Sequence, residues 1–137
     1  MMERIILWHP KPAHTKAELL RKVVQELESR GLVTDSAEII TLLHERENLG
    51  STLLTERLAI PHAQSEAITK AAIVYVATED PIADWQSASR FIFTFLPEAP
   101  DRGDAYAIRD FFIRLADDDV AEALGECDEE QVLELLT

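Results

Sequence analysis

Apolar residues recur at helical spacing near the start of the chain. The apolar face of this first stretch consists of Leu19, Leu20, Val23, Val24 and Leu27. Thr15 and Glu18 precede it with the spacing of a capping box, and Gly31 follows it in the position of a helix-terminating glycine. The pattern predicts an amphipathic helix between Thr15 and Gly31.

A second helical pattern follows closely. Thr34, Asp35 and Ser36 form a cluster of N-cap residues. The apolar face behind them consists of Ile39, Ile40, Leu42 and Leu43. This helix is expected to end near Gly50, and because its connection to the first helix is short, about four residues, the two should pack as an antiparallel pair.

Continuous apolar runs, rather than alternating ones, mark the strands. They lie at residues 5–8, 71–77 and 91–96, and the last two are rich in β-branched and aromatic residues. Strands of this kind are usually covered on both faces of a sheet. Shorter strand-like pieces lie at residues 52–54 and 58–60, and Pro61 prevents a helix across this region.

The C-terminal third returns to helical spacing. A helix is expected over residues 104–116, a short one up to Gly125, and a last one capped by Asp128 and Gln131. Because strands and helices are interspersed, the expected fold is a three-layer α/β domain with a mixed β-sheet and helices on both faces. Residues 1–137 should form this single domain, since one domain usually takes roughly 100–200 residues.

Composition and charge narrow the class of protein. The chain is 47% apolar and 28% charged, as in globular proteins. A net charge of −13 argues against binding to nucleic acid and to anionic lipid. The single cysteine excludes an intrachain disulfide and a cysteine-based zinc site. The sequence also has no His-Glu-x-x-His motif and no glycine-rich phosphate loop, and no metal or cofactor is expected. No apolar run approaches the roughly 20 residues of a membrane span. A cytoplasmic, soluble protein is the expectation.

Four histidines carry the candidate chemistry, because imidazole moves protons or accepts groups near neutral pH. His9 and His14 flank prolines after the first strand, and His44 lies within the second helix, so all three are expected at the surface. His62 directly follows Pro61 and an apolar run, which should hold its ring rigidly. From spacing alone, His62 is either a structural histidine or a reactive one.

The segments around these residues resemble a known family. Arg46-Glu47, Gly50-Ser51-Thr52 and residues 59–63 match, in identity and spacing, an L-L-x-R-E-x-x-G-S-T segment followed by G-I-A-I-P-H-A. Both segments belong to the enzyme IIA domain of the bacterial phosphoenolpyruvate-dependent sugar phosphotransferase system, fructose/mannitol (and nitrogen-regulatory) class. Pro81-Ile82 with Trp85 is similar to a later P-I-x-W element, and the C-terminal helices are also similar.

The resemblance implies a phosphohistidine relay. His62 would accept a phosphoryl group from phospho-HPr and pass it to a cysteine or histidine of an enzyme IIB partner. Arg46 would stabilise the phosphoryl charge, because guanidinium binds phosphate oxygens in a bidentate manner. Ser51 and Thr52 would donate hydroxyl hydrogen bonds to the phosphoryl group. The alternatives are a salt bridge of Arg46 with an acid on its own helix, and plain turn roles for Ser51 and Thr52.

The sequence departs from the family pattern in two places. Leu53, Thr55 and Arg57 stand where family members typically have glycines, so this loop should be stiffer. Many members also carry a second histidine where this chain has Ala105 or Tyr106. Three hypotheses follow: a transport phosphocarrier, a regulator of the nitrogen-regulatory type that senses phosphorylation at His62 and binds a regulated protein, and a degenerate module without phosphorylation.

Overall fold

The strands form one mixed sheet in the computed structural model, which describes residues 2–136. They are β1 (Glu3–Trp8), β2 (Leu58–Ala59), β3 (His62–Gln64), β4 (Ala72–Ile82) and β5 (Ala88–Leu96). Strand order is β1-β4-β5-β2, and β3 also pairs with β5. The pair β4–β5 is antiparallel, whereas β1 runs parallel to β4, and β2 and β3 run parallel to β5. The predicted mixed sheet is confirmed.

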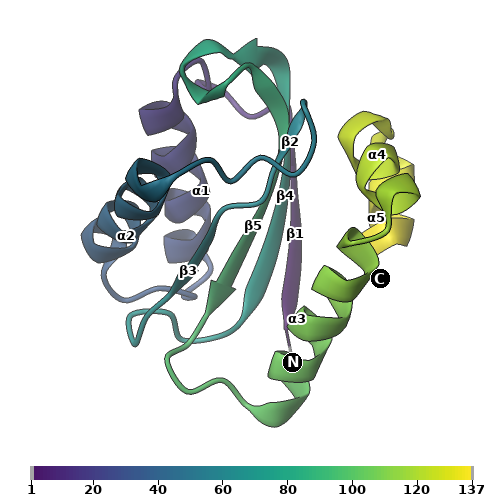
Figure 1. Ribbon diagram of the computed structural model, residues 1–137. Helices are drawn as coiled ribbons and strands as arrows, with labels where there is room; N and C mark the ends of the chain where they lie inside the picture. The colour runs from purple at the N-terminus through teal and green to yellow at the C-terminus, as the bar shows by residue number, and fades with distance from the viewer. Residues whose placement is uncertain (1, 137) are drawn as a thin grey trace.

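Helices cover both faces of this sheet, as predicted (Figure 1). The helices are α1 (Lys16–Ser29), α2 (Ser36–Leu49), η1 (Ala83–Trp85, a 3-10 turn), α3 (Arg102–Leu115), α4 (Asp118–Glu126) and α5 (Glu129–Leu136). Helices α1 and α2 pack on one face, and α3, α4 and α5 lie on the other. Each face has its own buried apolar cluster, so the three-layer arrangement follows directly from the two-sided burial of β4 and β5.

Side-chain alternation along β5 distributes residues between the two clusters. Phe91, Phe93 and Phe95 are buried on the side of α1 and α2, whereas Ile92 is buried on the side of α3. Because neighbours along a strand point to opposite faces, Thr94 also points toward the α3 side. This alternation sets the orientation of residues that pair with β5, including those of β3.

The predicted helix caps are observed. The Thr15 side chain accepts a hydrogen bond from Glu18 N, and the Glu18 carboxylate accepts one from Thr15 N, which completes the capping box. The Asp35 side chain caps α2 by accepting from Glu38 N. Gly31 adopts a φ of 73° after α1, a conformation for which glycine is favoured at helix ends.

The strands around η1 are longer than predicted. β4 continues through Pro81 to Ile82, and β5 begins at Ala88 instead of residue 91. A register irregularity between Ala77 and Ile82 accommodates the proline, which has no N–H to give to a ladder. The turn that joins the strands holds Gln86 and Ser87 at φ values of 54° and 60°. Such values are uncommon for residues other than glycine.

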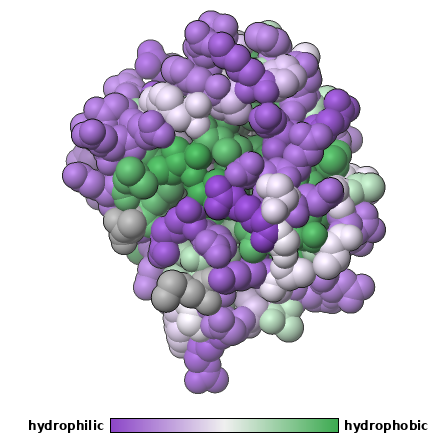
Figure 2. Space-filling view, turned by 180° about the vertical axis from the view of Figure 1, so that it is seen from behind, coloured by the Kyte–Doolittle hydropathy of each residue, from purple (hydrophilic) through white to green (hydrophobic). Residues whose placement is uncertain are grey.

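The β1 edge of the sheet is apolar. Among residues 2–136, β1 pairs only with β4, and its Ile6, Leu7 and Trp8 are half-buried. Figure 2 shows an apolar area bounded by polar residues on the rear side of the molecule. In the strand order, β1 and β3 lie at opposite edges, so the exposed edge of β1 is separate from the His62 region.

A buried tyrosine links the sheet to the helices of the α3 side. The Tyr75 hydroxyl donates a hydrogen bond to Leu124 O and accepts one from Arg90 Nη1 at 2.7 Å. Arg90 Nη1 also donates to Cys127 O at 2.7 Å. Burial raises the pKa of Tyr75 from its ordinary 10.0 to about 12, although the Arg90 guanidinium acts in the opposite direction.

The raised pKa of Tyr75 should make the free energy of unfolding fall at alkaline pH. A folded-state pKa above the unfolded value means that the neutral hydroxyl stabilises the fold below pH 10. That stabilisation is lost as pH rises from 10 through 12, by about 2–3 kcal/mol. Urea unfolding at pH 8, 10 and 12 should show this extra loss in the parent chain but not in Tyr75→Phe. Parallel pH profiles for the two proteins would contradict the assignment.

Candidate functional site

The backbone of His62 is held by the pairing of β3 with β5, whereas its side chain is exposed. It begins β3 and pairs in register with Thr94 of β5, and Thr94 N donates to Pro61 O at 3.0 Å. Pro61 and Ala63 are buried, whereas His62 is exposed. Ala63 belongs to the cluster on the α1–α2 side, so the His62 side chain points to the α3 side. The rigid setting expected from Pro61 is therefore present.

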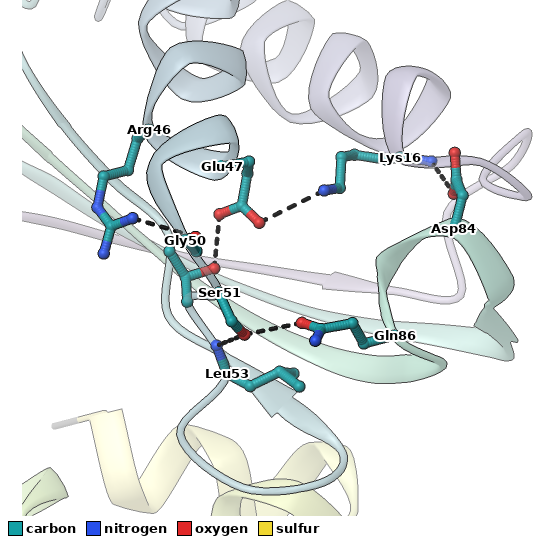
Figure 3. Close-up of polar contacts among 9 residues, drawn as sticks. Lys16, Arg46, Glu47, Gly50, Ser51, Leu53, Asp84 and Gln86 are labelled. Carbon is teal, nitrogen blue, oxygen red and sulfur yellow. Dashed lines mark hydrogen bonds and ion pairs between the residues drawn. The ribbon is translucent and has the colours of Figure 1, made fainter.

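Arg46 lies in the last turn of α2 and closes the end of this helix. Its Nη1 donates to Gly50 O at 3.2 Å (Figure 3). Gly50 adopts φ 155° and ψ 171°, a region that is essentially restricted to glycine. Arg46 is half-buried, and a guanidinium has five N–H donors. Donors beyond the one used for Gly50 thus remain for an anion.

Glu47 is the buried centre of a polar network at the same helix end. Its side chain is 4% exposed and forms an ion pair with Lys16 Nζ at 3.5 Å (Figure 3). Its carboxylate also accepts a hydrogen bond from Thr52 Oγ1 at 2.6 Å. Lys16 Nζ also lies 5.0 Å from the centre of the Trp85 ring. A hydroxyl has one proton to donate, and Thr52 gives it to Glu47. In this arrangement Thr52 therefore acts on the loop backbone and on Glu47, not as a free donor.

Ser51 joins this segment to the turn after η1. Its Oγ donates to Gln86 Oε1 at 2.7 Å and accepts from Leu53 N at 3.1 Å (Figure 3). Nearby, Lys16 N donates to Asp84 Oδ1 at 2.8 Å.

Backbone pairing connects the Ser51–Leu53 segment to the histidine strand. Ile60 N donates to Thr52 O at 2.8 Å, so Thr52 is fixed beside the residues that lead into His62. The structure therefore brings Arg46, Ser51 and Thr52 together around Gly50. Within residues 2–136, no hydrogen bond or ion pair joins Arg46 to His62.

The loop between Thr52 and Leu58 is ordered by side chains rather than by glycines. Thr55 Oγ1 accepts hydrogen bonds from Arg57 N at 3.3 Å and from Leu58 N at 3.2 Å. Arg57 forms an exposed ion pair with Glu126 at 3.5 Å. These bonds give the loop the additional restraint expected from the missing glycines.

Ala105 and Tyr106, the positions at which the resemblance places a second histidine, lie in the first half of α3. Both are exposed, and Tyr106 is 56% exposed. At the start of the helix, the Asp101 carboxylate accepts a hydrogen bond from Asp104 N at 3.0 Å. This backbone N–H holds the pKa of Asp101 below its ordinary value.

Two structural features are absent from the described part of the chain. No cluster of three or more histidine, cysteine or acidic side chains in it is placed to bind a metal ion. Its helices are all too short or too polar to cross a membrane.

Solved structures with the same fold include several IIA proteins. The IIA mannitol protein from Escherichia coli has a TM-score of 0.65 and 28% identity, covering 96% of this chain and 95% of that one. The complex of enzyme IIAMTL with phosphorylated enzyme IIBMTL from Escherichia coli gives a TM-score of 0.67 and 26% identity, covering 96% and 92%. Nitrogen Regulatory Protein IIA-Ntr from Neisseria meningitidis, at 24% identity, is similar in fold, with a TM-score of 0.73 and coverage of 97% and 92%.

The fold is thus that of the IIA proteins of the phosphotransferase system. The chain belongs to the family of the phosphoenolpyruvate-dependent sugar phosphotransferase system, EIIA 2, whose model matches residues 2–137. A curated relative, the PTS system 2-O-alpha-mannosyl-D-glycerate-specific EIIABC component of Escherichia coli (strain K12), is 28% identical over 87 residues. The match spans 64% of this chain and only 12% of that protein.

Proposed function

We propose that residues 1–137 form one cytoplasmic phosphocarrier domain that accepts a phosphoryl group from phospho-HPr on His62 and passes it to an enzyme IIB partner. The observation that carries the proposal is the exposed imidazole of His62 on a backbone fixed by Pro61 and Thr94. A neutral imidazole nitrogen is a good nucleophile. Membership of the EIIA 2 family supports the same chemistry.

The site residues have distinct roles in this proposal. Phosphoryl transfer depends mainly on positioning and on stabilising negative charge, and Arg46 supplies the charge. Ser51 holds the segment through Gln86, and Thr52 holds it through Glu47. The hydroxyl of Ser51 reaches a phosphoryl oxygen only by giving up its bond to Gln86.

Phosphorylation of the parent chain tests the proposal directly. The protein is incubated with phosphoenolpyruvate, enzyme I and HPr, and its intact mass is measured at neutral or mildly basic pH, because phosphohistidine is labile in acid. Gain of one phosphoryl group, placed on His62 by peptide fragmentation, is the expected result. No gain with a cognate HPr would overturn the proposal in favour of a binding module that kept the fold.

A regulatory role is the second candidate, because neither Ala105 nor Tyr106 of α3 is a histidine. In that role His62 is still phosphorylated, but the phosphorylation state controls binding to another protein. Adding purified IIB domains to the phosphorylated chain separates the candidates. Rapid loss of the phosphoryl group to IIB supports a carrier, whereas retention of the group supports a regulator.

Replacement of Arg46 should slow transfer without unfolding the protein. Loss of one donor that stabilises developing negative charge costs about 10²–10³-fold in rate, so Arg46→Gln should lower the phosphorylation rate by that factor. Arg57→Gln is the matched control, because its exposed ion pair with Glu126 contributes about 1 kcal/mol or less. Rapid-quench kinetics with phospho-HPr measures both. Equal rates for the two variants would contradict the role of Arg46.

A further inference from the structure

Thr94 carries a hydroxyl that the fold itself does not use. The side chain is 2% exposed, and among the described residues its Oγ1 is one of two buried side-chain polar atoms without a hydrogen-bond partner. The other is Trp85 Nε1. Burying a hydroxyl without a partner is unfavourable, and valine would fill the same space without that penalty. An unpartnered buried polar atom therefore points to a role outside folding.

The neighbour of this hydroxyl is the candidate phosphoryl acceptor. Thr94 and His62 are register partners in the parallel pair of β5 and β3, so their side chains project from the same face of the sheet. Neighbouring strands lie about 4.8 Å apart, a span that two side chains bridge. The His62 ring, too, makes no hydrogen bond or ion pair within the described chain. A buried hydroxyl without a partner thus lies beside the candidate phosphoryl acceptor.

We propose that Thr94 is a positioning residue whose Oγ1 accepts a hydrogen bond from His62 Nδ1–H. Nδ1 is the ring nitrogen nearer the backbone and hence the one that a register partner can reach. In this proposal, the His62 side chain takes the rotamer that turns Nδ1 toward Thr94. A hydrogen bond at one ring nitrogen determines which tautomer is present. The bond leaves the lone pair on the outer nitrogen, Nε2, facing the partner protein.

The role of Thr94 in the transfer step rests on the proposed function. The Nε2 lone pair forms a new bond to phosphorus, while the bond between phosphorus and the donor breaks and its electron pair stays with the donor. The proton remains on Nδ1, and the ring gains positive charge. Hydrogen bonds from charged donors are stronger than neutral ones. The bond to Thr94 therefore strengthens as transfer proceeds, which favours the transition state over the ground state.

Thr94→Val tests this role, because it keeps the shape of the side chain and removes the hydroxyl. Loss of a hydrogen bond to a charged group should slow phosphorylation about 10- to 100-fold, while the melting temperature stays the same or rises. Thr94→Ser should restore the rate to within about threefold of the parent, since it keeps the hydroxyl. A rate unchanged in Thr94→Val, or an equal loss in Thr94→Ser, would overturn the proposal.

Thr78→Val is the matched control within the same sheet. Thr78 is also a buried threonine, but its hydroxyl has acceptors for its one proton, Asp80 O at 2.8 Å and Ser89 O at 3.2 Å. Its replacement should lower the melting temperature and leave the phosphorylation rate as in the parent. Thr94→Val should therefore slow transfer without lowering the melting temperature, whereas Thr78→Val should lower the melting temperature without slowing transfer.

The ring tautomer gives a readout that needs no phosphoryl donor. Nitrogen-15 NMR of the unphosphorylated parent should show His62 with its proton on Nδ1, and Thr94→Val should show a mixture of tautomers. A proton on Nε2 in the parent would overturn the inference by itself. If the parent shows the Nδ1–H tautomer but accepts no phosphoryl group, the phosphocarrier proposal fails while the contact between Thr94 and His62 stands.

Discussion

His62→Gln is expected to accept no phosphoryl group from phospho-HPr, whereas the parent accepts one. Glutamine retains a polar side chain of similar reach but has no nucleophilic ring nitrogen. Because His62 is exposed, the free energy of unfolding should change by no more than about 0.5 kcal/mol. Intact mass after incubation with the donor system, together with urea unfolding, measures both quantities on the same preparation.

His14→Gln is the matched control for this loss. His14 is also exposed and lies in the loop before α1, so this variant should be phosphorylated like the parent. Phosphorylation of His62→Gln would place the acceptor on another residue and remove the basis of the proposed relay. If His14→Gln is phosphorylated less than the parent, the loop before α1 takes part in recognition of the donor.

Local signals in the sequence were sufficient for most elements of the fold. Thr15 and Glu18 are close in sequence, and their capping box is present as predicted. The two-sided burial of β4 and β5 likewise follows from their own composition. The sequence does not predict the extensions of these strands, because Pro81 and Arg90 are not typical strand residues. Arg90 is held by its pairing with Ala77 and by the hydrogen bonds of its side chain to Tyr75 and Cys127.

The candidate site depended on contacts that no local pattern reveals. Lys16 reaches Glu47, and Gln86 reaches Ser51, from distant parts of the sequence. The sequence identified Thr52 as a hydroxyl near the site but gave no sign that Glu47 would engage it. Thr94 is similar, since its importance comes from its register with His62, and register between β5 and β3 is a property of the folded sheet.

These long-range contacts make Glu47 the residue on which the shape of the site depends. It joins the start of α1 through Lys16, the end of α2 through its own backbone, and the segment before His62 through Thr52. Lys16 in turn covers the face of Trp85, which is buried against Phe91 at a ring distance of 4.7 Å. A defect at Glu47 should therefore affect both stability and transfer.

Glu47→Ala is expected to lower the free energy of unfolding by about 3 kcal/mol. Removing one partner of a buried ion pair leaves the other charge uncompensated, which typically costs about 3–5 kcal/mol. The lower end applies because Lys16 keeps 23% of its side chain exposed to water. Thr52 also loses the acceptor of its hydroxyl. Urea denaturation at neutral pH measures the change, and Glu45→Ala, an exposed position on the same helix, should change stability by less than about 0.5 kcal/mol.

A double-mutant cycle with Lys16→Met and Glu47→Ala separates the energy of the ion pair from the energy of the lost packing. Lys16→Met removes the ammonium, so adding Glu47→Ala to it should cost less than Glu47→Ala costs alone. A coupling energy of about 1–3 kcal/mol is expected, because contacting residues of one network are not additive. Additive losses would show that Glu47 acts only by filling space. In that case Thr52 should remain ordered in Glu47→Ala, and transfer to His62 should continue at the parent rate.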